Sequence, residues 1–344
     1  MSERGTNPII SVIVPNYDGV VHLNDCLSAL GGQTFHDFEI LLVDNGSRDH
    51  SVDFVRAKFP EVRILRLPAN RGFAGAINAG ISAARGDFIA LLNNDTAAAP
   101  GWLDALHRAT NDSAFDMWAS RVLMFDRPHL LDSAGDGFTT AAAPFKRGHL
   151  ELARDYDSNT EVFSPSGSAA LFRKALIEEA GLLDEDFFLV HEDVDFGLRA
   201  RLLGYRCLYV ADATVSHKLN SSIGYMSRDY VFYGQRNLEY VFWKDLPLSL
   251  LVRCLPAHAT FNCFAFGHFI LRGRGLVFIH AKLAALLNLP TLLRKRREIQ
   301  TRRRLSPQAL RQGMTSNWFA VKLRMRSRGR ERLAKLQAEV TRQP

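Results

Sequence analysis

Three apolar segments in the first hundred residues end in polar side chains that could bind a ligand. Asn16 follows the first segment, Asp44 follows the second, and the triplet Asn93-Asn94-Asp95 follows a later one. Asp44 could accept hydrogen bonds from a nucleotide base or ribose. Asp95 could hold a divalent cation that bridges a diphosphate, because hard cations take oxygen ligands. These residue types predict a nucleotide site that includes a metal.

The segments that carry these side chains alternate with amphipathic or small-residue segments. Apolar strands separated by helices are typical of a parallel sheet covered by helices on both faces. The sequence predicts strands at 8–15, 38–47, 62–68 and 87–95, and helices at 22–30, 49–59 and 72–84. Ligands of such sheets bind beyond the carboxyl ends of the strands. The three polar strand ends therefore predict one shared site.

Two common nucleotide-binding signatures are absent from the sequence. Neither GxGxxG nor the P-loop GxxxxGK[ST] follows the first predicted strand. A sugar-nucleotide pyrophosphorylase would also need a glycine-rich basic loop there, where this chain reads VPNYDGVVHL. Residues 70–80, NRGFAGAINAG, would instead place small residues and a helix N-terminus beside the nucleotide.

The middle of the chain predicts a helix with an acidic start. Residues 187–210, FFLVHEDVDFGLRARLLGYRCLYV, read as an apolar run, a helix with an acidic start and a basic end, and a strand. This charge order suits the helix dipole. Residues 117–149 are irregular and predict loops and short strands.

The charge of the chain is unevenly distributed. The net charge of the 344 residues is +7, but residues 291–344 hold 16 Lys or Arg against 3 Glu, which leaves −6 for the remainder. A basic tail on a mildly acidic body predicts contact with a polyanion such as an anionic membrane surface. A solvated tail and a nucleic-acid patch are alternatives, although no nucleic-acid-binding module accompanies the tail.

The region after residue 225 is rich in aromatic and apolar residues. Its longest apolar stretch, 246–271, is interrupted by Arg253, Pro256, His258 and His268, whereas a spanning helix needs about 20 mostly apolar residues. We expect helices in the membrane interface, with LRKRR (293–297) and TRRR (301–304) facing lipid phosphates. An ordinary helical core and a dimer surface are the alternatives.

The expected location is cytoplasmic, peripheral at the cytoplasmic face of the cell membrane. We identify no signal peptide at the N-terminus. The four cysteines have no CxxC spacing, which predicts reduced and mostly buried thiols with no metal or disulfide framework.

Several motifs, taken in order, resemble those of the inverting family 2 glycosyltransferases of the GT-A fold. They are SVIVPNYDG, ILLVDNGSRDHS, NRGFAGAINAG, FIALLNNDT, GSAALFRKALIEEAGLLDEDFFLVHEDVDFGLRARLLGYR and VSHKLNSS. The resemblance covers about residues 8–225 and is to the bacterial rhamnosyltransferase-like branch of surface polysaccharide assembly. It implies a Rossmann-like mixed α/β sheet flanked by helices over 1–225, followed by a helical, membrane-associated region over 226–344 with the basic tail.

The resemblance also implies a role for individual residues. Asp193, in the HED stretch, matches the general base, and Glu192 beside it shapes the acceptor site. Asp44 contacts the base or ribose, and Asp95 is the metal-binding aspartate of a DxD-like motif. The further positions are the metal ligand His217 and, on the donor side, Pro15, Asn16, Arg71, Gly72, Asn78 and Asn94. The implied cofactor is Mg²⁺ or Mn²⁺.

Each of these assignments has a simpler structural alternative. Asp44 could be a turn residue before Asn45-Gly46, and Asp95 a strand-end cap. Asp186, Glu192 and Asp195 compete with Asp193 for the role of base, because acids at a helix start are often dipole partners. A lone histidine after a strand, such as His217, is often a structural group.

The expected activity is transfer of a sugar from a nucleotide-diphosphate donor to a lipid-linked or polysaccharide acceptor, with inversion, in cell-surface polysaccharide biosynthesis. Rhamnose from its dTDP form is one candidate sugar. Asn93 departs from the DxD pattern, and one carboxylate fewer weakens metal binding. The alternative is a non-catalytic GT-A-like scaffold that binds nucleotide or membrane. No nucleic-acid partner is expected, and an oligomer is compatible with the sequence.

Overall fold

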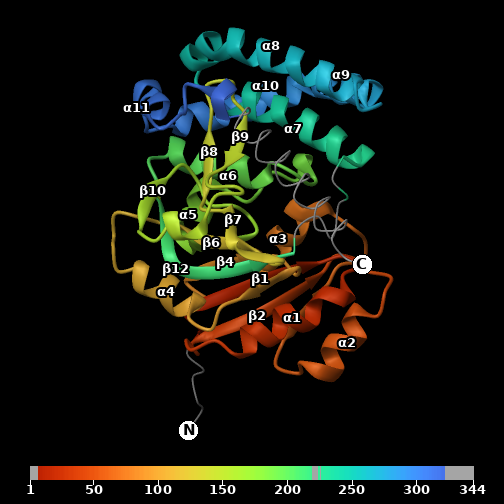
Figure 1. Cartoon of the computed structure of the whole chain (residues 1–344), viewed down its shortest axis with the longest axis vertical. Coiled ribbons are helices and arrows are strands. Elements are labelled where there is room, and N and C mark those ends of the chain that lie inside the picture. Colours follow the sequence, from red (N-terminus) through yellow and green to blue (C-terminus); the bar gives the residue numbers. More distant parts are fainter. Residues whose placement is uncertain (1–6, 219–223, 225, 322–344) are drawn as a thin grey trace, which may run out of the picture.

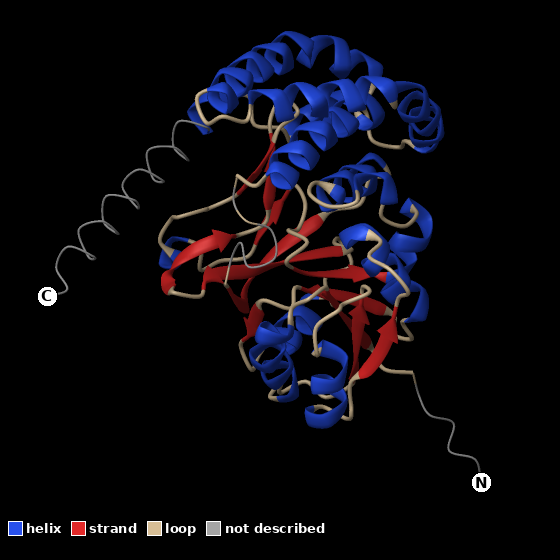
Figure 2. Cartoon of the chain, turned by 90° about the vertical axis from the view of Figure 1, so that its right-hand side faces the viewer, coloured by secondary structure: helices blue, strands red, loops and turns tan. Residues whose placement is uncertain are grey.

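The computed structural model describes residues 7–218, 224 and 226–321 of the chain. A mixed β-sheet with helices on both faces forms its centre, and a layer of helices lies at one end of the molecule (Figure 1). Figure 2, turned by 90°, shows the same separation between the sheet and the terminal helices. The α/β class and the C-terminal helical extension are thereby confirmed.

The N-terminal part alternates strands and helices as the apolar pattern predicts. Its elements are β1 (Ile10–Asn16), α1 (Val20–Gly31), β2 (Phe38–Asp44), α2 (Ser51–Lys58), β3 (Arg63–Arg66), α3 (Gly72–Ala83) and β4 (Phe88–Leu92). Strand β1 pairs in parallel with both β2 and β4, and β2 pairs in parallel with β3. The carboxyl ends of these strands therefore meet at one edge.

The following segment adds strands of both directions. Its elements are β5 (Thr96–Ala98), α4 (Trp102–Ala109), β6 (Met117–Met124), β7 (Arg127–Ser133), β8 (Asp136–Phe138), β9 (Pro144–Lys146), η1 (Ala153–Asp155), β10 (Thr160–Val162), β11 (Ala169–Arg173), α5 (Lys174–Ala180), η2 (Glu185–Phe187), α6 (Glu192–Leu202) and β12 (Cys207–His217). The main sheet has the order β10-β12-β6-β11-β4-β1-β2-β3. β11 runs antiparallel to β4 and β6, and β12 runs parallel to β6. Strands β6 and β7 are longer than the short strands predicted there.

Helices bury both faces of the sheet. One apolar core lies between the sheet and α1, α2 and α4, and the other lies between the sheet and α3, α5 and α6. The small residues of α3 allow it to approach β1 closely: a Cβ on Gly80 would lie 2.5 Å from Ile13 Cγ2. This close packing fixes the N-terminus of α3 beside the carboxyl ends of β1 and β2.

The C-terminal helices pack against the sheet domain through α6. They are α7 (Arg228–Asp245), α8 (Leu248–Ile270), α9 (Gly275–Leu287), α10 (Leu289–Arg302) and α11 (Pro307–Gln312). Helix α7 begins after Ser227, whose Oγ accepts a hydrogen bond from Tyr230 N. A third apolar core joins Leu198 of α6 with Val241 and Leu292. The domain boundary predicted at 225 falls between β12 and α7 and remains a prediction.

The length and composition of the helices indicate which of them could cross a membrane. Within the described part of the chain, no single helix is long and apolar enough to cross a bilayer. Helices α9 and α10 meet the length and composition criteria only as a pair, with a bend of 59° at their junction.

Candidate active site

The polar ends of β1, β2 and β4 lie together, as the sequence predicts. Asn16 and Asp44 are direct partners in the register of β1 and β2. Asn94 Nδ2 donates to Asn16 Oδ1 at 2.7 Å, which joins the end of β4 to the end of β1. Pro15 occupies the preceding position of β1, opposite Val43. This edge of the sheet therefore presents a carboxylate and two amides within one small area.

Asp44 is buried without the hydrogen bonds that a buried carboxylate normally requires. Its exposed fraction is 0%, and neither carboxylate oxygen has a hydrogen-bond partner among the described residues. Arg66 Nε lies 3.7 Å from Asp44 Oδ2, too far for a hydrogen bond. Leaving such a group unsatisfied is unfavourable. Asp44 is therefore suited to accept hydrogen bonds from a ligand.

Asp95 and His217 lie side by side at the same edge. The pairing of β12 with β5 places His217 opposite Thr96, next to Asp95. His217 Nε2 is 3.2 Å from Asp95 Oδ1, and His217 Nδ1 is 2.9 Å from Asp132 Oδ2. Asp132 thus orients the imidazole so that Nε2 points to Asp95.

The charges around this histidine are strongly negative. Burial lowers the pKa of His217, but hydrogen bonds and charges from Asp132 and Asp95 outweigh burial and raise it. Burial also opposes ionisation of Asp132, yet the Lys146 charge and two histidine hydrogen bonds hold its pKa well below the usual range. Two carboxylates facing one imidazole create a field that favours a cation.

The Asp95–His217 pair fits a divalent ion as two of its ligands. Asp95 Oδ1 and His217 Nε2 lie 3.2 Å apart, so one ion could contact both atoms once His217 is deprotonated at Nε2. Carboxylates suit Mg²⁺ and Mn²⁺, and an imidazole ligand is common for transition metals. In the described ranges, no group of three or more His, Cys, Asp or Glu side chains is arranged to hold a metal. Oxygen atoms of a diphosphate could complete this partial set.

Two hydrogen bonds connect Asp193 to the carboxyl end of β4. Gly167 N donates to Asp193 Oδ2 at 2.8 Å, and the next residue, Ser168, accepts a hydrogen bond at its backbone oxygen from Asn93 N at 3.0 Å. A Cβ on Gly167 would lie 3.1 Å from Asp193 Oδ2, so glycine permits this approach. Val194 N donates to Asp193 Oδ1 at 2.8 Å. The carboxylate is thereby fixed at the start of α6.

The competing acids are engaged elsewhere. Asp195 is fully buried and pairs with Arg199 and with Lys244. Asp186 pairs with Lys295 at 2.8 Å. These ion pairs tie α6 and η2 to the C-terminal helices, which favours Asp193 as the acid available for proton transfer.

Lys146 interacts electrostatically with both Asp132 and Asp193. Its Nζ lies 2.7 Å from Asp132 Oδ2. Burial lowers the pKa of Lys146, but the charges of Asp132, Asp136 and Asp193 outweigh it and raise the pKa. Asp193 and Asp132, the partner of His217, therefore both act on Lys146.

Glu192, next to Asp193, favours its neutral form. Its exposed fraction is 6%, and its Oε2 has no hydrogen-bond partner within the described residues. Burial and the neighbouring Asp193 charge raise the pKa of Glu192 to about 8. A protonated Glu192 can donate a hydrogen bond, a property that suits a residue predicted to shape an acceptor site.

Glu192→Gln is expected to make the free energy of unfolding less dependent on pH. The folded state holds the Glu192 proton more tightly than the unfolded chain, so this group's stabilisation is complete below pH about 4.5 and is lost as the pH rises through about 8. The variant cannot ionise, so its advantage over wild type grows by at most about 1.4 kcal/mol per pH unit. Urea unfolding at several pH values measures this. If the free energy of unfolding changed with pH in the same way for the two proteins, Glu192 would not be protonated in the folded state at neutral pH.

The remaining donor-side positions connect α3 with the segment before α6. Arg71 Nη2 lies 2.8 Å from Glu185 Oε2, and Asn78 exchanges two hydrogen bonds with the backbone of Leu183. A Cβ on Gly72 would lie 2.2 Å from the Phe188 carbonyl oxygen. The donor-binding roles of Arg71, Gly72 and Asn78 stay predictions, because these contacts already give them a positioning role.

Asn237 is a positioning residue that sequence reasoning missed. It is fully buried in α7, and its Nδ2 lies 2.9, 2.8 and 2.7 Å from the carbonyl oxygens of Phe187, Leu189 and Val190. Phe188, Val190 and His191 all adopt left-handed φ values of 63–72°, which non-glycine residues adopt at a cost. Asn237 therefore stabilises the strained backbone that leads into Glu192 and Asp193. Its place inside an aromatic helix gave no signal in the sequence.

Comparison with protein families identifies the sheet domain. Residues 11–181 match the family model described as "Glycosyl transferase family 2". The chain is 29% identical over 239 residues to "Uncharacterized glycosyltransferase YwdF" of Bacillus subtilis, with 67% of this chain and 81% of the relative covered. It is 28% identical over 284 residues to "N-acetylglucosaminyl-diphospho-decaprenol L-rhamnosyltransferase" of Mycobacterium tuberculosis, with coverage of 71% and 89%.

Solved structures share the fold. The mannosyltransferase PcManGT from Pyrobaculum calidifontis, in complex with GDP-Man and Mn²⁺, aligns with a TM-score of 0.51 at 17% identity over 87% of this chain and 86% of its own. GalNAc-T7 with UDP, GalNAc and Mn²⁺ aligns with a TM-score of 0.55 at 16% identity over 74% and 55%. The mixed sheet is thus that of the GT-A enzymes, as the motifs predict. The chain belongs to glycosyl transferase family 2 and is a glycosyltransferase.

Proposed function

We propose that the chain transfers a sugar such as rhamnose from a nucleotide-diphosphate donor to a lipid-linked or polysaccharide acceptor, with inversion, in cell-surface polysaccharide biosynthesis. The name of the mycobacterial relative, N-acetylglucosaminyl-diphospho-decaprenol L-rhamnosyltransferase, supports the sugar and a lipid-linked acceptor. The nucleotide ligands and Mn²⁺ of the structural neighbours support the donor class and the cofactor. The proposed location is the cytoplasmic face of the membrane.

The donor binds across the shared strand edge in this proposal. Asp44 accepts hydrogen bonds from the base or ribose, which would satisfy its two unpartnered oxygens. Asp95 and His217 would hold Mg²⁺ or Mn²⁺, which when bound would supply positive charge to stabilise the leaving diphosphate.

Asp193 acts as the general base. It removes the proton from an acceptor hydroxyl while that oxygen forms a bond to the anomeric carbon and the bond from this carbon to the diphosphate breaks. Attack from the face opposite the leaving group inverts the anomeric configuration. The observation that supports this proposal is the short link from Asp193 through Gly167 and Ser168 to Asn93, because it brings the Asp193 carboxylate near the carboxyl end of β4.

A donor panel tests the proposed function. The protein is incubated with Mn²⁺, a polyprenyl-diphosphate-linked acceptor and, separately, dTDP-rhamnose, GDP-mannose and UDP-hexoses. We expect turnover with one of these donors and an inverted anomeric configuration by NMR. A product with retained configuration would contradict the mechanism. Nucleotide binding without turnover across the panel would favour the non-catalytic scaffold.

Asp132→Asn is expected to weaken Mn²⁺ binding in the presence of nucleotide diphosphate by about 10- to 100-fold. Residues that orient a metal-ligating histidine typically have effects of this size, and Asp132 holds His217 through Nδ1. Calorimetric titration of Mn²⁺ measures the change. Asp126→Asn is a matched control, since Asp126 is exposed between β6 and β7. Unchanged Mn²⁺ affinity in a folded Asp132→Asn protein would show that the Asp132 carboxylate does not support ion binding through His217.

A further inference from the structure

The outer side of α8 and α9 exposes many large apolar side chains. These helices lie at the end of the molecule, away from the central sheet (Figure 1). Leu276 and Leu287 of α9 are 84% and 83% exposed. The face also includes Leu248, Val252, Phe264 and Leu283. An exposed apolar face of this extent marks an interaction surface.

The charge of this region restricts what can cover the face. Residues 246–297 contain eight Arg or Lys and no Asp or Glu. Arg253, Arg272, Arg294 and Arg297 are exposed. A second copy of the chain on a symmetric interface would bring like charges together, which is unfavourable. An anionic lipid surface offers both apolar contact and opposite charge.

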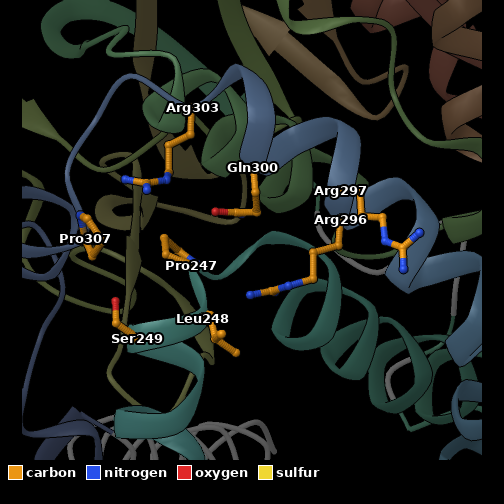
Figure 3. Close-up of a pocket in the computed structure, with 8 residues that line it drawn as sticks. All are labelled: Pro247, Leu248, Ser249, Arg296, Arg297, Gln300, Arg303 and Pro307. Atoms are coloured by element: carbon orange, nitrogen blue, oxygen red, sulfur yellow. The ribbon is translucent and has the colours of Figure 1, made fainter.

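A pocket of about 370 Å³ lies at the edge of this face (Figure 3). Leu248 and Ser249 at the start of α8 form one side, and Arg296, Arg297 and Gln300 of α10 form the other, together with Arg303 just beyond it. Leu248 belongs both to the pocket and to the apolar face, so the two are continuous.

The pocket has hydrogen-bond donors without partners. Arg296 Nη2 and Arg303 Nε are buried and have no hydrogen-bond partner among the described residues. No side chain caps the N-terminus of α8, a helix of 23 residues, so its first backbone N–H groups add donors and positive potential.

The neighbouring acidic group does not oppose an anion. No carboxylate lines the pocket. The charge of Asp245 acts on Arg296, but burial and the nearby Asp195 charge raise the pKa of Asp245 well above the usual range. Its neutral form is therefore favoured, and the field in the pocket stays positive.

We propose that this pocket binds the phosphate group of an anionic membrane lipid while the apolar face of α8 and α9 contacts the lipid acyl region. The proposal deepens the membrane location included in the proposed function by assigning the surface and the lipid group that it recognises. Several basic residues of this region instead bind within the protein: Lys295 pairs with Asp184 and Asp186, and Arg304 pairs with Glu179. The proposed phosphate site therefore consists of the pocket arginines alone and not of all basic residues in the region.

Vesicle co-sedimentation with matched double variants tests the pocket. Arg296→Gln/Arg303→Gln removes the two pocket side chains that carry unpartnered donors, and Arg253→Gln/Arg294→Gln removes two exposed charges outside the pocket. We expect the pocket variant to bind phosphatidylglycerol-containing vesicles at least about tenfold more weakly than the control variant, because buried charge-assisted hydrogen bonds exceed surface attraction. Equal losses in the two variants would overturn a specific phosphate site. Thermal unfolding verifies that both variants are folded.

Two further arms separate the lipid from other occupants. Leu276→Gln/Leu287→Gln is expected to reduce binding to vesicles with and without phosphatidylglycerol. Calorimetry with inorganic pyrophosphate tests a free phosphate source: binding of pyrophosphate without binding of vesicles would overturn the lipid proposal. The lipid proposal would also be overturned if the wild type did not bind vesicles but formed a dimer in analytical ultracentrifugation, and if Leu276→Gln/Leu287→Gln abolished that dimer. Sugar transfer to a detergent-solubilised acceptor is independent of this surface, so its failure would count against the proposed function instead.

Discussion

Asp193→Asn is expected to lower kcat for sugar transfer by about 10²- to 10⁴-fold, the usual contribution of a general base. The substituted amide is similar in size and keeps a carbonyl oxygen that can accept the hydrogen bond from Gly167 or from Val194, so the start of α6 is expected to persist. It cannot accept the proton of the acceptor hydroxyl. Donor affinity is expected to stay within about twofold, because the proposed role of Asp193 is on the acceptor.

A matched variant distinguishes this effect from a general loss of charge. Asp212→Asn removes a carboxylate from an exposed position of β12 and is expected to leave turnover unchanged. Steady-state kinetics with the donor found in the panel compares the two variants. If Asp193→Asn had the turnover of the wild type, Asp193 would not be the general base, and Glu192 would be the next candidate.

Asp95→Asn is expected to abolish most of the Mn²⁺ dependence of nucleotide-diphosphate binding. Asn93 already replaces one carboxylate of the motif, so in the proposed site Asp95 would supply the negative charge for the ion at this strand end. We expect the Mn²⁺ concentration for half-maximal nucleotide binding to rise by more than about 100-fold, since loss of a direct ligand exceeds the about 10- to 100-fold effect of a residue that orients one.

Calorimetry with and without Mn²⁺ measures this change. Nucleotide binding in the absence of metal is expected to persist in Asp95→Asn, because the unpartnered oxygens of Asp44 are unaffected. An Mn²⁺ dependence equal to that of wild type would show that the ion binds elsewhere.

The strand ends of the N-terminal half could be predicted from local sequence patterns. The apolar runs that end at Asn16, Asp44 and Leu92 form parallel strands, and parallel strands bring their carboxyl ends to one edge. Periodicity alone was sufficient for this convergence. It was insufficient over 117–149, where polar residues such as Arg121 interrupt the pattern of β6.

The long-range contacts of the site could not be predicted in this way. Asp132 is 85 residues from its partner His217, and Asn237 is 47–50 residues from the carbonyl groups that it holds. The pKa of Glu192 depends on burial, which results from the packing of α6 against the sheet and α7. Such effects arise from tertiary structure rather than from neighbouring residues in the chain.

The basic side chains of the C-terminal region fall into two groups in the structure. The sequence predicts that both LRKRR and TRRR face lipid phosphates. The structure divides their side chains: Lys295 and Arg304 form ion pairs inside the protein, whereas Arg297 and Arg303 line the pocket beside Leu248. Residues 322–344 of the predicted basic tail lie outside the described part of the chain.

The most direct test of the account is a structure of the protein with Mn²⁺ and the donor identified in the panel. We expect the ion in contact with Asp95 and His217, the base or ribose at Asp44, and the anomeric carbon on the side that faces Asp193. A donor bound away from these strand ends, or one with its anomeric carbon turned away from Asp193, would contradict the proposed mechanism.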